Sequence, residues 1–311
     1  MPLFGKRNSA PAPLSEEDQQ AAAVDLQRIA AGGIPLGAEQ RLKRVAASDA
    51  PVFNSDLTAK EYAICQAAGL TPIAQVMGSS VVQHGWSNYS WGTFGGGISE
   101  VPSMATPWNL SRERSFGRLR QEADFAGADS VLGIELIAKS FLGEAGQVEY
   151  AIFGTAVRDI AFARAGGTGA RLCTLDAQNV VKLRQIGGET LDVIGHTSVV
   201  CAALGMQANQ MMGAWWGNTE LTEVSRAVSA ARHLAMNEVR RQAAAAGANE
   251  MVISGLRHNI DHHEIERGAG YGRQHYFIVS MHVLGTAVAL GAHDPHPHPL
   301  GVPMMSINLG A

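Results

Sequence analysis

Two long segments of the sequence echo each other, and this internal repeat constrains the fold more than any other feature. The motifs that recur in the same order are Val-Met-Gly (76–78) as Val-Ile-Gly (193–195), Ala-Gly-Ala-Asp (126–129) as Ala-Gly-Ala-Asn (246–249), and Gly-Thr-Ala-Val (154–157) as Gly-Thr-Ala-Val (285–288). The spacing between paired motifs drifts slowly, as loop insertions would make it drift. The preserved order predicts two tandem copies of one structural unit.

Caps and hydrophobic periodicity predict the helices of each copy. Thr58, followed three residues later by Glu61, has a capping-box pattern, and Gly69 supplies a helix stop. The equivalent helix in copy two begins near Asp176. A longer helix follows in each copy, because apolar residues recur at helical spacing. The residues of these stripes are Phe116, Leu119, Ala123 and Ala126 in copy one, and Val224, Val228, Ala231, Ala235 and Val239 in copy two.

Runs rich in β-branched residues predict three strands in each copy. They span residues 73–82, 130–137 and 148–157 in copy one, and 191–200, 250–256 and 276–289 in copy two. Gly154 and Gly285, inside the last strands, predict a bulge or a close backbone approach. Each unit is thus helix, strand, helix, strand, strand, an α+β domain with an exposed sheet face or edge. Packing between repeats or between chains is expected to bury that surface.

The predicted elements divide the chain into five parts. These are an N-terminal extension (1–52), a first domain (53–161), a linker (162–172), a second domain (173–289) and a tail rich in His and Pro (290–311). Residues 84–109 are dense in Gly, Ser and Trp and are expected to form a long loop. In the extension, a cap at Ser15 and a break at Pro35 predict two short amphipathic helices. We expect them to dock on an oligomeric ring or on a partner.

Composition argues against several classes of protein. The balance of 24 Lys and Arg against 28 Asp and Glu gives a formal net charge of −4, which disfavours binding to nucleic acid. The N-terminus has no apolar core typical of a signal peptide, and the longest apolar stretch is interrupted by polar residues, so stable membrane insertion is not expected. With 46% hydrophobic and only 17% charged residues, the sparse charged surface favours subunit contacts. Cys65, Cys173 and Cys201 lie far apart and predict buried, reduced thiols in a cytoplasmic protein.

Three motifs in a fixed order point to a known family. They are Met-Gly-Ser-Ser-Val-Val (77–82), Ala-Gly-Ala-Asp-Ser-Val-Leu-Gly-Ile (126–134) and the terminal Gly-Thr-Ala-Val. Their combination resembles the YbjQ-like family, which carries a heavy-metal-binding label. The resemblance covers residues 53–161 and 173–289, and it implies tandem dodecin-like β-α-β-β domains and a ring-shaped homopentamer, without a defined set of metal ligands. The fusion of two copies, the Trp-rich insertion and the longer hairpin of copy two depart from the family pattern and leave the ring stoichiometry open.

Histidines gather in copy two and are candidate ligands for Zn, Ni or Cu. The candidates are His258, His262, His263 and His275 in the hairpin, and His293, His296 and His298 in the tail. Neighbouring His262 and His263 would point to opposite sides of a strand, so the hairpin predicts either a metal site or a solvated polar loop. The tail predicts either loose metal binding or a flexible segment. His282, flanked by apolar residues, is interpreted as a core histidine with a satisfied hydrogen bond.

Tryptophans form a second set of candidates, for binding a small molecule of unknown identity. Trp86, Trp91, Trp215 and Trp216 fall in corresponding loops of the two copies, together with Trp108. Such rings are expected either to pack between protomers or to form a ligand platform. Glycine-rich stretches lack the strand, loop and helix context of a nucleotide site, and the signatures of a nucleophile elbow and a zinc-protease helix are absent from the sequence.

The leading hypothesis is therefore a non-enzymatic, oligomeric binding or scaffold protein that holds a transition metal through the histidines of copy two. Two alternatives stay open. One is a dodecin-like carrier that binds a small molecule through the Trp loops, and the other is an enzyme with an intersubunit site.

Overall fold

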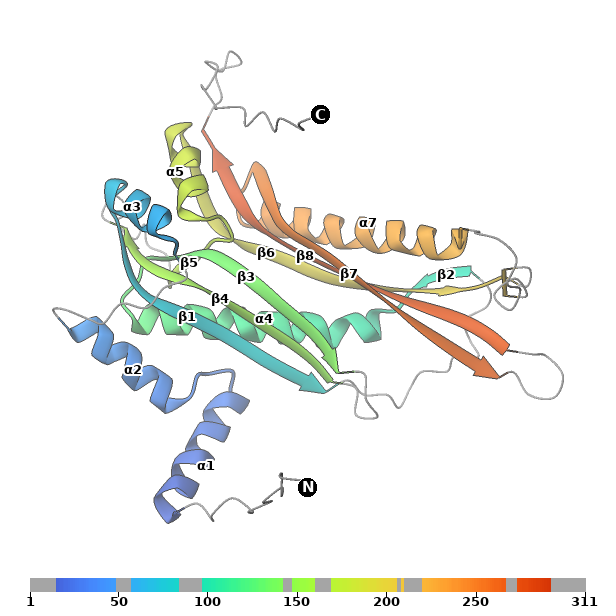
Figure 1. Cartoon of the computed structure of the whole chain (residues 1–311), viewed down its shortest axis with the longest axis horizontal. Helices are drawn as coiled ribbons and strands as arrows, with labels where there is room; N and C mark the ends of the chain where they lie inside the picture. Colours follow the sequence, from blue (N-terminus) through green and yellow to red (C-terminus); the bar gives the residue numbers. More distant parts are fainter. Residues whose placement is uncertain are drawn as a thin grey trace, which may run out of the picture.

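The computed structural model describes residues 15–48, 57–83, 97–141, 147–159, 169–205, 208–209, 220–266 and 273–291. Its strands form two four-stranded sheets, in the order β1-β4-β3-β5 (sheet A) and β2-β6-β8-β7 (sheet B). Long helices run along the sheets, and two short helices lie near one end (Figure 1). This mixture of helices and mainly antiparallel strands confirms the expected α+β fold.

In the first half of the chain, a short capped helix precedes the first strand of sheet A. Its elements are α3 (Ala59–Ala67), β1 (Leu70–Gln83), α4 (Pro102–Phe125), β3 (Ser130–Phe141) and β4 (Gln147–Asp159). The predicted capping box is present, because the backbone N–H of Thr58 donates to Glu61 Oε2 at 2.7 Å and that of Glu61 donates to Thr58 Oγ1 at 3.3 Å. Gly69, with φ of 72°, follows the helix in the left-handed conformation that ends it.

The second half repeats this order of elements. They are α5 (Ala177–Gln185), β6 (Gly188–Ala203), α7 (Thr222–Ala245), β7 (Glu250–Glu266) and β8 (Arg273–Leu290). Asp176 caps α5, since its Oδ1 accepts from the backbone N–H of Asn179 at 2.7 Å. In each sheet the last strand lies between the other two long ones, as β1-β4-β3 and β6-β8-β7.

Two short strands link the two halves of the chain by pairing with long strands of the other half. β2 (Gly97–Glu100) pairs with β6 in sheet B, and β5 (Arg171–Leu172) pairs in parallel with β3 in sheet A. The expected loop over residues 84–109 is therefore wrong from residue 97 onward, where β2 and then α4 begin. Met104, Ala105 and Trp108 form a buried helical face there, so Trp108 is a core residue of α4 rather than a loop residue.

The glycines within the last strands lie opposite bulges, as their place in the sequence predicts. The register of β3 against β4 shifts between Leu132 and Glu135, and that of β7 against β8 shifts between Ile253 and Gly255. A Cβ at Gly154 would lie 2.9 Å from the carbonyl oxygen of Leu132, and the equivalent atom at Gly285 would lie 2.4 Å from that of Val252. Both strands thus use glycine to pass a bulged neighbour.

Helix α4 packs on both sheets, whereas α7 packs on sheet B (Figure 1). Leu119 and Ala123 of α4 are buried in one core with Tyr150 and Ile152 of sheet A. That core continues through the start of α4 to residues of sheet B, which are Val199, Cys201, Ala203, Tyr276 and Ile278. The opposite face of sheet B packs on α7 in a separate core. Packing between repeats therefore buries part of the exposed sheet surface that the sequence predicts.

The N-terminal extension forms the two expected helices, α1 (Glu16–Ala30) and α2 (Leu36–Ala47), with Pro35 at the break. They dock on their own chain. The guanidinium of Arg118 in α4 donates to the carbonyl oxygens of Ile29 at 3.0 Å and Gly33 at 3.2 Å, and Leu42 is fully buried. No helix in the described part of the chain is long and apolar enough to span a membrane.

Candidate functional site

The histidine-rich segment of copy two is a continuation of the β7–β8 ladder. Strand β7 runs to Glu266, and its pairing with β8 continues to Glu266 opposite Arg273. Residues 258–264 therefore lie on a strand paired with β8, as the expected hairpin requires, and not in a solvated polar loop. Strand β7 extends well past the residues 250–256 that the sequence predicts, because it stays paired with β8 while its side chains are exposed or half-buried, as in a ladder that has water on one side.

The ladder brings His262 and His275 together. His262 Nε2 lies 2.9 Å from His275 Nδ1, and the ring of His262 also stacks on Phe277 with centroids 4.7 Å apart. His258 shares that face of β7, and His263 points to the other face, as the period of a strand requires.

The remaining candidates give no larger cluster. Within the described ranges no group of three or more His, Cys, Asp and Glu is arranged to hold a metal ion. His293, His296, His298, Trp86, Trp91, Trp215 and Trp216 lie outside the described residues.

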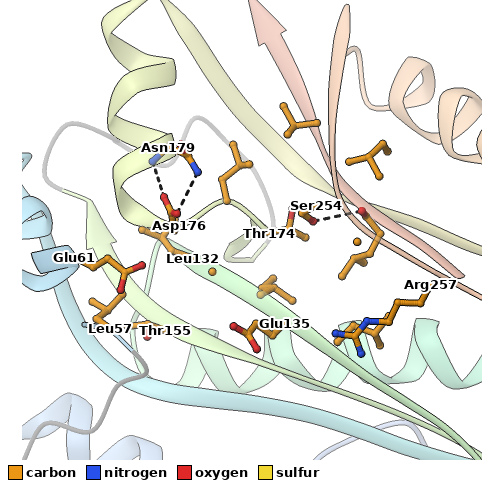
Figure 2. A pocket seen from close by; sticks show the side chains of 18 of the residues that line it. Leu57, Glu61, Leu132, Glu135, Thr155, Thr174, Asp176, Asn179, Ser254 and Arg257 are labelled. Atoms are coloured by element: carbon orange, nitrogen blue, oxygen red, sulfur yellow. Dashed lines mark hydrogen bonds between the residues drawn. The ribbon is translucent and has the colours of Figure 1, made fainter. Parts of the chain in front are cut away.

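A cleft with a volume of about 650 Å³ lies between the bulged parts of β3 and β7 (Figure 2). The two sheets share no strand pairing at this point, so their edges leave space between them. The cleft is lined by hydroxyl, carboxylate and guanidinium groups as well as apolar side chains. The polar residues that line it include Glu61, Glu135, Thr155, Thr174, Asp176, Asn179, Ser254 and Arg257. Its size is typical of a site for a small molecule.

Thr155 of β4 lines the cleft with a hydroxyl group that is buried and has no hydrogen-bond partner among the described residues. The side chain is 1% exposed. Its counterpart in the repeat, Thr286, is differently placed, because Thr286 Oγ1 accepts from the backbone N–H of Thr174 at 2.9 Å and lies 2.8 Å from Thr174 Oγ1. A buried hydroxyl without a partner costs free energy, so Thr155 is a candidate ligand-binding group.

Two of the charged groups of the cleft already make hydrogen bonds to described residues, and two do not. The carboxylate of Glu61 accepts hydrogen bonds from Thr58, and that of Asp176 caps α5. Glu135 on β3 and Arg257 on β7 are exposed, and neither has an ion-pair partner within the described ranges. Figure 2 shows these two side chains on opposite sides of the cleft. The described lining carries three carboxylates and one guanidinium, an excess of negative charge.

His282 forms part of the inner lining and is the core histidine that the sequence predicts. Its Nδ1 lies 2.9 Å from Thr197 Oγ1, and its ring meets Trp108 edge to face with centroids 4.6 Å apart. Burial, together with the positive charges of Arg112 and Arg257, lowers the pKa of His282 to about 4.

This lowered pKa predicts a loss of stability in acid. Between pH about 6.5 and about 4 the unfolded state binds a proton that the folded state does not, so stability falls as the pH falls, by up to about 3 kcal/mol for this group. Urea unfolding of wild type and His282→Asn at pH 7 and pH 4.5 measures the effect. The variant is expected to lose less stability between the two pH values, and equal losses would show that His282 is protonated in the folded protein.

The three cysteines are free and buried, as expected. Burial raises the pKa of each thiol to about 11. Because the thiolate is the reactive form, none of them is an activated nucleophile.

A second surface feature is the uncovered face of sheet A. Met77 and Val81 of β1 and Ile137 of β3 share this face and are 50%, 57% and 38% exposed. The equivalent face of sheet B is covered by the start of α4, where Trp108 packs on His282. In sheet A, Ala151 occupies the position of His282 in the repeat, and no described helix covers the outer part of the face.

The sequence does not single out most of the residues that make the cleft. Thr155 appears in it only as part of a repeated motif, and Glu61 only as a helix cap. Arg257 directly precedes the first candidate histidine, and no motif around it marks it as a binding residue. The repeat is the one sequence feature that draws attention to Thr155, since Thr155 and Thr286 occupy matching positions whose surroundings can be compared.

Comparison with known proteins gives two relatives. The encapsulin nanocompartment protein Rv1762c of Mycobacterium tuberculosis is 31% identical over 214 residues, which cover 64% of this chain and 76% of that protein. A UPF0145 protein of Methanococcus vannielii is 42% identical over 58 residues, which cover 19% of this chain and 53% of that protein, about half its length. The second match supports a YbjQ-like domain within the chain.

No family model and no solved structure matches the chain. The extent of the first match is nevertheless sufficient to assign a family. The chain belongs to the same family as the encapsulin nanocompartment protein Rv1762c.

Proposed function

We propose that this protein is a non-enzymatic, self-assembling binding protein of the cytoplasm, built from two YbjQ-like units with a dodecin-like β-α-β-β order. Copies associate through the uncovered face of sheet A, and the assembly takes part in a nanocompartment, as the name of its relative describes for that protein. The observation that carries the proposal is the exposed set of Met77, Val81 and Ile137 on one sheet face.

The occupant of this face is a second copy of the chain. The same face of the other sheet is already covered by packing within the chain, so the fold needs an equivalent cover for sheet A. β1 is also the terminal strand of its sheet, so one side of its backbone faces no other described strand. An apolar face beside an open strand edge is a favourable surface for subunit association.

Sedimentation velocity of the full chain at micromolar concentration tests this proposal. Val81→Lys places a charge on this face, opposite Glu149 of β4, and is expected to weaken association by at least tenfold, because removing a charge from water is costly. Leu26→Lys is the matched control, since Leu26 is 69% exposed on α1, away from sheet A.

The control should sediment like wild type. Equal sedimentation of Val81→Lys and wild type as oligomers would mean that copies associate elsewhere, and a monomeric wild type would remove the proposal altogether. A species of five chains would support the pentameric ring that the family resemblance implies.

A second candidate function is transition-metal binding by His262 and His275, favoured by the 2.9 Å approach of their ring nitrogens. Two imidazoles supply half of a tetrahedral zinc site, and the remaining ligands would come from other residues or water. Protein purified without a nickel column is expected to bind added Zn²⁺, and His275→Ala should lower the bound metal several-fold.

His233→Ala is the control for metal binding, because His233 lies exposed on α7. Elemental analysis after dialysis measures the bound metal. Equal zinc contents in wild type and both variants would exclude the pair as a binding site.

A further inference from the structure

The cleft between the sheets contains a buried hydroxyl and two charged side chains that no described partner neutralises. These are Thr155, Glu135 and Arg257. We propose that the cleft binds a small molecule with a protonated amine, held by the carboxylate of Glu135 and by the hydroxyl of Thr155. The site adjoins the exposed face of sheet A, because Glu135 and Ile137 are two residues apart on β3. Titration with an amine measures ligand binding and not association, so failure of this inference can be told apart from failure of the proposed function.

The buried hydroxyl is the observation that distinguishes this cleft from an ordinary gap between elements. In the second half, Thr174 satisfies the hydroxyl of Thr286 through two contacts of 2.8 and 2.9 Å. In the first half, the hydroxyl of Thr155 lines the cleft without such a partner within the described ranges. An ammonium group donates up to three hydrogen bonds, and a threonine hydroxyl accepts, so an amine that reaches the Thr155 hydroxyl would satisfy it.

The charge of the lining favours a cation over an anion. Glu61, Glu135 and Asp176 are acidic, and of these Glu135 makes no hydrogen bond or ion pair to another described residue. Glu61 and Asp176 already accept from their helix N-termini, so they contribute mainly their charge. A hydrogen bond to a charged group is roughly twice as strong as a neutral one, so a protonated amine gains most from Glu135.

Arg257 on the opposite wall decides between two kinds of amine. A simple diamine has no group for the guanidinium, and Arg257 would repel it weakly. An amino acid carries a carboxylate that Arg257 can bind in a bidentate manner. Both share the ammonium chemistry of the proposal.

Isothermal titration of the full-length protein with 1,4-diaminobutane, L-lysine and glutarate tests the inference. We expect at least one of the two amines to bind with a stoichiometry of one per chain, and glutarate to bind much more weakly. Thr155→Val and Glu135→Gln should each weaken amine binding by at least tenfold. Glu250→Gln is the control, because Glu250 is an exposed carboxylate on the same strand as Arg257 but outside the cleft, and it should leave binding unchanged.

Arg257→Gln separates the two sources of the amine. Tighter diamine binding in this variant would identify a ligand without a carboxylate, and lost lysine binding would identify a zwitterion; either result supports the site. Binding of neither amine at millimolar concentration, stronger binding of glutarate, or amine binding that survives both Thr155→Val and Glu135→Gln would overturn the proposal. Circular dichroism of each variant shows whether the fold is retained.

Discussion

Replacing Gly78 by alanine is expected to lower the free energy of unfolding by about 3 kcal/mol or more. Gly78 lies in β1 where α4 crosses it, and a Cβ there would lie 2.0 Å from the carbonyl oxygen of Ser115 and 2.8 Å from the backbone nitrogen of Leu119. Both obstructing atoms belong to the helix backbone, so α4 itself must move. Urea unfolding followed by circular dichroism, at one protein concentration, measures the loss.

Gly117→Ala provides the matched control within the same helix. Apart from the backbone of its own helix, no heavy atom lies within 4 Å of a Cβ built at Gly117. Alanine stabilises a helix interior by about 1 kcal/mol relative to glycine, so this variant is expected to be more stable than wild type. If Gly78→Ala is as stable as wild type, α4 does not pack on β1 as closely as described.

Replacing the two equivalent threonines by valine should have opposite effects. Thr286→Val removes the acceptor for the backbone N–H of Thr174 and leaves that buried donor unpaired, which costs about 1 to 3 kcal/mol. Thr155→Val removes a hydroxyl that is already buried without a described partner, so it should leave stability unchanged or raise it by about 1 kcal/mol. The same urea unfolding experiment compares them.

The contrast between the two variants is more informative than either value. A loss of stability at Thr155 as large as that at Thr286 would mean that the Thr155 hydroxyl has a partner in the folded protein. It would then have no reason to recruit a ligand, and the cleft would lose the feature on which its assignment depends.

Local sequence patterns predict most of the elements of this fold. The caps at Thr58 and Asp176 fix the starts of α3 and α5, and the glycines at 154 and 285 mark both bulges. These features depend on residues a few positions apart, so they are legible in one sequence. The α+β class follows from them.

Features that depend on distant contacts are less predictable. Strand β2 has four residues and exists because β6 pairs with it, and Trp108 belongs to a helix because its ring fills the core against His282. The length of β7 likewise depends on β8. For the same reason the sequence does not predict the cleft, because Glu135 and Arg257 line it together only after both sheets have formed (Figure 2).

The most direct test of self-assembly is the mass of the wild-type protein in solution, measured by sedimentation equilibrium across the micromolar range. We expect a species at an integral multiple of the 32.9 kDa chain mass that persists on dilution and moves toward the monomer in Val81→Lys. A single species of 32.9 kDa at every concentration would show that the exposed face of sheet A stays in water, and would contradict the proposed assembly.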